Sequence, residues 1–278
     1  MQVGRVTAVA WPDQRAVAGD LARLADRATE WPGLGVRDPG PLRLIVVPDG
    51  RMLDSLSSGR APSWGAAIAV PGARTILLRA DEGELARTLR HELAHLALHE
   101  ALAVRVPLWF DEGYAGWAAG EWARLGTLEL NLAVVRGALP TLTGLDGALR
   151  GSASTADVAY ALAVSAVVEL ARRNPTGTLA PLLRRLEAGE DFDAAVLATT
   201  GLSMGRFEQE WQRALRRRYT LGNWLIAGGG WLIVALLVAV QIRRRRRLDR
   251  ARRAALDDGW DVEPEPEQGP ELDPTTDR

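Results

Sequence analysis

The chain has 278 residues, a formal net charge of −1, an apolar fraction of 47% and no cysteine. This length and apolar content suffice for one sizeable buried core or two small ones. The near-zero charge predicts no nucleic-acid partner. The lack of cysteine excludes disulfide bridges, thiolate metal sites and a cysteine nucleophile. All 34 basic residues are arginine, so no lysine is available as a nucleophile or Schiff-base former.

The N-terminal part predicts a small sheet with a helix. Val6–Val9 and Leu42–Val47 are apolar runs typical of strands, and helical spacing of apolar residues predicts a helix over Ala16–Trp31. Gly65–Val70 and Thr75–Leu78 predict two further strands.

The rest of the chain up to residue 219 predicts mostly helices. Asp81, with Glu84 three residues later, is typical of a capping box that opens a helix running to about Ala103. A second helix is expected from about Phe110 to Leu125. The region from Asp157 to Tyr219 predicts several helices, with breaks at Asn174–Gly177, Gly189 and Gly201.

The three histidines of the chain lie within nine consecutive residues, and two of them form the HExxH pattern His91-Glu92-Leu93-Ala94-His95. On a helix, residues four apart share one face, so His91 and His95 can bind one metal ion. Glu92 lies about 100° round the helix, beside the ion, where it can act as general base on a Zn-activated water.

Glu112, 17 residues after His95, is the candidate third ligand. Pro107 ends the first helix, so the second helix can bring Glu112 back toward it. A His₂Glu set suits catalytic zinc. The alternatives are that Glu112 is an ordinary acid at a helix start and that His99 is the ligand; we expect His99 to contact a ligand or solvent instead.

The segment that follows HELAH, residues 106–115 (VPLWFDEGYA), completes a longer pattern. Together the two resemble the bacterial peptidase MA-like family of gluzincin metallopeptidases, which carry HExxH and then Pro-x-Trp-x-x-Glu-Gly-x-Ala. The resemblance runs from about Leu42 to Trp211. It implies an α+β, zincin-like fold, a Zn²⁺ cofactor held by His91, His95 and Glu112, and a peptide or protein substrate.

The resemblance also implies further roles. Relatives often have an acidic residue where this chain has Gly116, so a carboxylate that orients a ligand is expected to be absent there, and Asp111 is the candidate to orient a histidine instead. Tyr160 resembles a family tyrosine that donates a hydrogen bond to the developing oxyanion; the alternative is a core or surface tyrosine. Gly65–Val70 is the candidate edge strand to which substrate adds.

Residues 219–242 carry no charge and are followed by Arg243–Arg247. This pattern predicts one transmembrane helix in contact with membrane lipid. By the positive-inside rule, the protein is then a single-pass cell-membrane protein with residues 1–218 outside and a basic, then acidic, disordered tail (243–278) in the cytoplasm. The first ten residues lack a signal-peptide pattern, so either the true N-terminus is missing, or the domain is cytoplasmic and the charge rule fails; we favour the first.

The sequence therefore predicts three parts: a zinc metallopeptidase domain (1–218) with a small N-terminal sheet, an HExxH helix and a mostly helical C-terminal part, a transmembrane helix (219–242) and the tail. The predicted function is membrane-anchored, zinc-dependent hydrolysis of peptide bonds. The alternative is a catalytically silent, membrane-anchored binding module on the same fold, which the intact Glu92 disfavours. An intramembrane protease is excluded because residues 81–100, which include the HExxH helix, carry seven Asp, Glu and Arg side chains.

Overall fold

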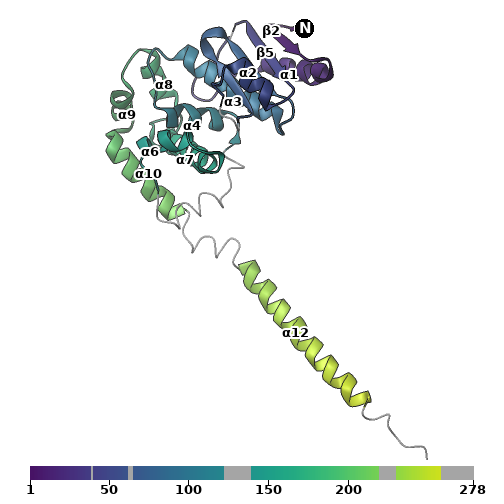
Figure 1. The fold of residues 1–278 in the computed structure, drawn as a ribbon. Helices are drawn as coiled ribbons and strands as arrows, with labels where there is room; N and C mark the ends of the chain where they lie inside the picture. Colours follow the sequence, from purple (N-terminus) through teal and green to yellow (C-terminus); the bar gives the residue numbers. More distant parts are fainter. Residues whose placement is uncertain (39, 62–64, 122–138, 219–229, 258–278) are drawn as a thin grey trace, which may run out of the picture. The chain divides into compact units, whose positions relative to one another are not determined.

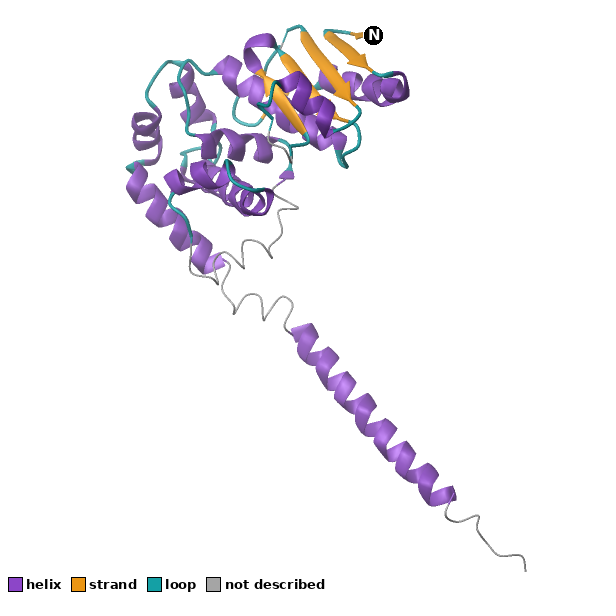
Figure 2. Ribbon diagram, viewed as in Figure 1, coloured by secondary structure: helices purple, strands orange, loops and turns teal. Residues whose placement is uncertain are grey.

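The computed structural model describes residues 1–38, 40–61, 65–121, 139–218 and 230–257 (Figure 1). The chain divides into two compact units, Met1–Leu221 and Gly222–Arg278. The first unit is α+β, with a sheet formed by its N-terminal part and helices throughout its C-terminal part (Figure 2). The described part of the second unit is the helix α12 (Gly230–Asp257).

A five-stranded sheet has the order β1-β2-β5-β7-β6. Its three inner strands are parallel, with Ala8 opposite Leu44 and Leu44 opposite Ile76, and the edge strands β1 and β6 run antiparallel to their neighbours. The predicted strands are confirmed within two residues at each end. The strands are β1 (Gln2–Val3), β2 (Val6–Ala10), β5 (Leu42–Val47), β6 (Ala67–Val70) and β7 (Thr75–Arg79), and a separate hairpin pairs β3 (Glu30–Trp31) with β4 (Gly35–Val36).

Helices cover both faces of this sheet. Successive side chains of a strand point to opposite faces, and Leu44 and Ile76 join the main core, to which α1 (Arg15–Arg27) and α3 (Leu85–Ala101) contribute. Val47 and Leu77 point the other way and pack with α2 (Gly50–Ser57). Burial on both faces explains why the inner strands are continuous apolar runs rather than alternating ones.

The helical part is built around α7. This helix contacts α4, α6, α9 and α10, and its middle turns are fully buried. The predicted helix breaks at Asn174–Gly177, Gly189 and Gly201 are confirmed. The helices are α4 (Leu108–Ala118), α6 (Leu142–Leu149), α7 (Ala153–Arg173), α8 (Ala180–Glu187), α9 (Phe192–Thr200) and α10 (Met204–Arg218).

Two predicted helix boundaries are wrong. The first helix ends at Arg27, and Trp31 lies in a strand instead. The capping box is also absent, because α3 begins at Leu85 after Glu84, which has a left-handed backbone (φ 60°) and no capping side chain. Asp81 instead accepts hydrogen bonds from Arg79, at 3.0 and 3.1 Å. Of the predicted second helix, α4 forms the part up to Ala118, and residues 122–125 lie outside the described residues.

The predicted transmembrane helix over residues 219–242 is also wrong. Residues 219–229 lie outside the described residues, and α12 has only the apolar segment from Gly230 to Ile242 before Arg243 begins its charged part. A helical span needs about 20 apolar residues. Among the helices that the structure describes, none is long and apolar enough to cross a membrane. The helix continues to Asp257, so the segment expected to be disordered from 243 is helical up to that residue.

A close contact between α4 and α7 sets the position of the residue that follows Glu112. A Cβ atom added at Gly113 would lie 2.5 Å from the carbonyl oxygen of Ala163 and 2.7 Å from its carbonyl carbon. Both of these are backbone atoms of α7, so neither can move without shifting the helix. Glycine at 113 therefore lets the two helices approach more closely than any other residue would allow.

Gly113→Ala is expected to destabilise the protein by about 1–3 kcal/mol, the usual cost of overpacking a core. Gly147→Ala in α6 is the matched control. An added Cβ there meets nothing within 4 Å, so the better helix propensity of alanine should leave stability unchanged or slightly raised. Urea unfolding of the metal-free variants measures both effects, and equal stabilities would contradict the packing argument.

Candidate metal centre

Two histidines on successive turns of α3 point the same way. The Nε2 atoms of His91 and His95 lie 3.2 Å apart, with their rings edge to face at a centroid distance of 4.9 Å. Both side chains are largely buried. The four-residue spacing on one helix face produces this convergence, as the sequence predicted.

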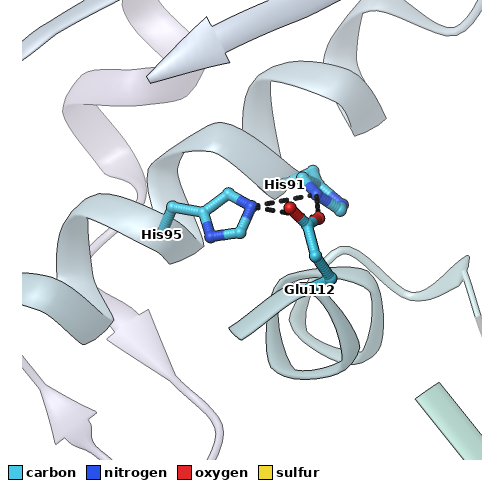
Figure 3. Close-up of side chains that lie close together, drawn as sticks. All are labelled: His91, His95 and Glu112. Atoms are coloured by element: carbon cyan, nitrogen blue, oxygen red, sulfur yellow. Dashed lines mark hydrogen bonds and ion pairs between the residues drawn. The ribbon is translucent and has the colours of Figure 1, made fainter. Parts of the chain in front are cut away.

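Glu112 approaches the same two atoms from α4 (Figure 3). Its Oε2 atom lies 3.4 Å from Nε2 of His91 and 3.5 Å from Nε2 of His95. The structure thus brings the three predicted ligands together, with one ligand atom from each within 4.8 Å of the others.

The dimensions of this triangle fit zinc. Four ligands at a zinc–nitrogen distance of about 2.0–2.1 Å, arranged as a tetrahedron, have neighbouring ligand atoms about 3.3–3.4 Å apart. The three observed separations of 3.2, 3.4 and 3.5 Å lie close to that value. Three protein ligands also leave one corner of the tetrahedron open, as in catalytic zinc sites.

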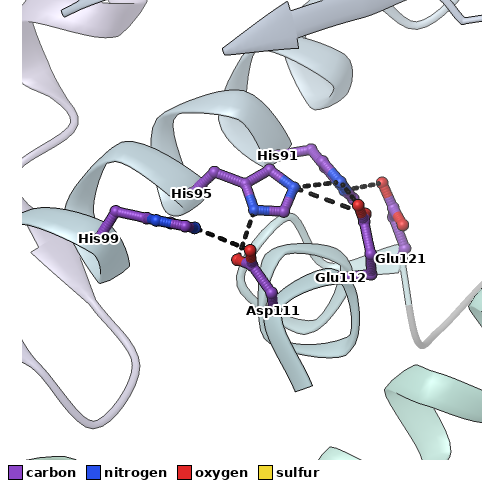
Figure 4. A network of polar contacts seen from close by, with 6 residues as sticks. All are labelled: His91, His95, His99, Asp111, Glu112 and Glu121. Atoms are coloured by element: carbon purple, nitrogen blue, oxygen red, sulfur yellow. Dashed lines mark hydrogen bonds and ion pairs between the residues drawn. The ribbon is translucent and has the colours of Figure 1, made fainter. Parts of the chain in front are cut away.

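The other nitrogen of each ring contacts a carboxylate (Figure 4). Nδ1 of His95 lies 2.7 Å from Oδ1 of Asp111, and Nδ1 of His91 lies 3.2 Å from Oε1 of Glu121. A carboxylate accepts a hydrogen bond from Nδ1–H, and in a neutral ring this leaves the lone pair on Nε2. Once a ring has lost its second proton to become neutral, this contact therefore favours the tautomer that a metal ligand requires.

His99 lies outside the triangle. Its Nε2 atom is 2.7 Å from Oδ2 of Asp111, and its side chain is 43% exposed. His95, His99 and Asp111 form a second group whose ligand atoms lie close together. That group is the weaker candidate, because the Nδ1 atom of His95 already contacts Asp111 and one of its three members, His99, is exposed.

The site is rich in buried negative charge. Burial disfavours a charged imidazole, but hydrogen bonds with Glu112 and Glu121 raise the pKa of His91 to about 10. Burial likewise disfavours a charged Glu112, but hydrogen bonds with His91 and His95 lower its pKa to about 2. The pKa of Asp111 falls below its ordinary value for the same reason, since His95 and His99 outweigh its burial. Buried carboxylates of this kind need a cation, either a protonated histidine or a metal ion.

Glu92 lies beside the triangle but takes no part in it. Its side chain is buried, which raises the pKa of its carboxyl group, and the backbone N–H of Ala69 in β6 donates a hydrogen bond to it. The Glu92 carboxylate therefore lies between α3, which carries the HExxH pattern, and the edge strand β6.

Tyr160 reaches the site from α7. Its ring centroid lies 6.4 Å from that of His91, and its side chain makes a hydrogen bond with Glu112. Burial and the neighbouring carboxylates raise the pKa of its hydroxyl, so the hydroxyl stays protonated as a hydrogen-bond donor. Ala163, which packs on Gly113, lies one turn along the same helix, so the close contact of α4 with α7 also brings Tyr160 to Glu112.

These side chains line a cleft of about 740 Å³. The edge strand β6 forms one wall, as predicted for Gly65–Val70, and the opposite wall comes from α4, α6 and α7. Two arginines, Arg60 and Arg150, also line it. A larger cavity, of about 920 Å³, surrounds the hairpin of β3 and β4, but its lining contains arginines and glutamates and no histidine.

Sequence reasoning missed Glu121. The predicted helix ran through position 121 to Leu125, which gave that residue no route to His91. In the structure α4 ends at Ala118, and Gly120 has a left-handed backbone with φ of 77°. Glycine adopts this conformation readily and commonly follows the end of a helix, so Gly120 was the signal that a turn brings the next residue back.

The chain matches the family model of the peptidase MA superfamily over residues 34–217. The matched segment contains every residue of the site described above. A comparison with curated proteins finds no match. The family match agrees with the resemblance carried by HELAH and the Glu-Gly segment, and it spans well over half of the sequence. The protein therefore belongs to the peptidase MA superfamily.

Proposed function

We propose that this protein is a zinc metallopeptidase of the gluzincin type, with His91, His95 and Glu112 as the zinc ligands. The observation that carries the proposal is the triangle of three ligand atoms, whose separations of 3.2–3.5 Å suit tetrahedral zinc. Membership of the peptidase MA superfamily supports peptide-bond hydrolysis as the reaction.

Glu92 is the proposed general base. When bound, zinc polarises a substrate carbonyl and makes a water molecule easier to deprotonate. Glu92 is placed to accept that proton and to return it to the leaving amine. Its buried position raises the pKa of its carboxyl group, and a base with a pKa closer to neutrality exchanges protons more effectively than an ordinary carboxylate.

Tyr160 is the proposed donor to the oxyanion that develops on the attacked carbonyl. Its hydroxyl is protonated, lines the cleft and lies beside Glu112. A hydrogen-bond donor fixed in a partly desolvated site stabilises such charge more than solvent does.

The edge strand β6 is the proposed docking site for the substrate backbone. It is the last strand of the sheet, and residues 65–69 line the cleft beside Glu92. An extended peptide can pair with a free strand edge through main-chain hydrogen bonds. The small side chains of Ala66, Ala67 and Ala69 leave room for a second backbone to approach.

A catalytically silent binding module is the second candidate. It would keep the triangle but has no use for a buried carboxylate such as Glu92, whose desolvation is unfavourable. The presence of Glu92 and Tyr160 at the same cleft therefore favours the enzyme, and the two candidates differ in whether a zinc-loaded protein cleaves peptides.

The full-length protein is expected to bind about one zinc ion per chain, as a three-ligand site requires. Glu112→Gln removes the charged ligand and should lower the zinc content well below that of the wild type. His99→Ala is the control and should retain zinc. Elemental analysis after dialysis measures the content, and loss in His99→Ala with retention in Glu112→Gln would show that His99 is the ligand.

Glu92→Gln is expected to lower kcat by roughly 10²–10⁴-fold, the usual contribution of a general base, while the zinc content stays that of the wild type. Mass spectrometry of a diverse peptide mixture identifies a cleaved peptide, and the rate on that peptide gives kcat. A zinc-loaded wild type that cleaves no peptide would favour the binding module.

Tyr160→Phe is expected to lower kcat by roughly 10²–10³-fold, as loss of an oxyanion donor does, with little change in KM or zinc content. Tyr114→Phe is the matched control, because the Tyr114 hydroxyl donates to the carbonyl of Pro32 instead. Equal activities of the two variants would remove Tyr160 from the proposed mechanism.

A further inference from the structure

Glu121 belongs to the polar network but has no role in the proposed mechanism. Its Oε1 atom lies 3.2 Å from Nδ1 of His91, whereas Glu112 contacts Nε2 of the same ring (Figure 4). It faces the nitrogen that does not point at the triangle, so it is placed to orient a ligand rather than to act as one.

The backbone delivers Glu121 to this place by a sharp turn. Ala119 closes α4, and Gly120 follows with φ of 77°. An added Cβ at Gly120 would meet nothing within 4 Å, so the backbone angle, and not lack of space, is what requires glycine there. The turn directs residue 121 back toward α3, where a continued helix would carry it away.

Gly116 provides the space that the Glu121 side chain occupies. A Cβ added at Gly116 would lie 2.8 Å from Oε2 of Glu121 and 2.7 Å from Cγ2 of Val164. Position 116 is the place at which the sequence pattern led us to expect an acidic residue. A side chain at 116 and the observed Glu121 therefore compete for the same volume beside His91.

We propose that Glu121 is the positioning residue of His91, and that Gly116 is small because the orienting carboxylate comes from position 121 instead. The proposal rests on the proposed zinc site. The contact of Glu121 with His91 has a counterpart at the other histidine ligand, His95, whose Nδ1 atom lies 2.7 Å from Oδ1 of Asp111. Both histidines then have one carboxylate each, from different positions of one helix and the turn after it.

A purely structural role for Glu121 is the rival explanation. Glu121 has only a 24% exposed side chain, and removing it leaves a gap that can destabilise the fold. A structural role would act on the whole protein, whereas a positioning role acts on the affinity and geometry of the metal site. The two are separated by measuring metal binding and unfolding on the same variants.

The experiment compares full-length Glu121→Ala with Glu187→Ala. Glu187 pairs with Arg37 away from the site, and its side chain is 26% exposed, close to that of Glu121. Zinc affinity is measured by competition with a chelator, and the site geometry by the visible absorption of the Co²⁺-substituted protein. Thermal unfolding of the metal-free proteins reports any general loss of stability.

Glu121→Ala is expected to weaken zinc binding by roughly 10–100-fold, the usual effect of removing a partner of a metal-bound histidine, and to change the Co²⁺ spectrum. Glu121→Gln, which keeps an acceptor without the charge, should recover part of the affinity, and Glu187→Ala should equal the wild type. Zinc affinity and Co²⁺ spectrum unchanged in a folded Glu121→Ala would overturn the proposal. A wild type that binds no zinc would instead refute the proposed function.

The link between positions 116 and 121 has its own test. Gly116→Ala should weaken zinc binding in the wild type, because its Cβ displaces Glu121. The same change should have a smaller effect in Glu121→Ala, where only the contact with Val164 remains. This comparison isolates the interaction between the two positions. Equal losses in both backgrounds would contradict the claim that Gly116 makes room for Glu121.

Discussion

The arrangement of the whole cleft depends on one carboxylate held opposite two histidines. Oε2 of Glu112 is almost equally distant from the Nε2 atoms of His91 and His95, and these atoms belong to two helices joined by a short connection. That placement requires α4 to lie against α3 on one side and α7 on the other. Gly113 permits the second of these contacts, because a Cβ atom there would collide with the α7 backbone. The same contact between α4 and α7 brings Tyr160 to the cleft, so the close packing at Gly113 also places a proposed catalytic side chain.

Charge balance explains why so many acids gather around two histidines. Glu112 and Asp111 remain ionised although burial opposes it, because the imidazoles hydrogen-bond to them. Without a metal ion the histidines supply the compensating charge, which is why the pKa of His91 rises to about 10. A divalent cation at the triangle would take over that compensation and release the imidazole protons. The negative charge of Glu112 and Asp111 is thus compensated either by protonated histidines or by a bound metal ion.

The sequence predicted the parts of the site that depend on local spacing. The interval between His91 and His95 defines one helix face, and the 17-residue step to Glu112 leaves room for one reversal of the chain. It failed where a backbone angle decides the outcome. Glu84 has a left-handed backbone, so α3 begins later than predicted, at Leu85. The left-handed turn at Gly120 places Glu121 beside His91. A pattern of apolar residues encodes neither backbone angle. Prediction from the sequence also failed where residues 219–242 were counted as one spanning helix, since no helix in the described part of the chain is long and apolar enough for a span.

The two buried glutamates of the cleft differ in a way that suits the roles we propose for them. Burial alone would raise the pKa of both Glu92 and Glu112. Glu112 has hydrogen bonds with two histidines, which reverse the effect and lower its pKa to about 2. For Glu92 burial is the largest cause and outweighs the nearby charges of His95 and His91, so its pKa rises. One carboxylate therefore stays charged to hold a cation while the other can take up a proton, and environments that separate the pKa values of two acids in this way are typical of acid–base catalysis.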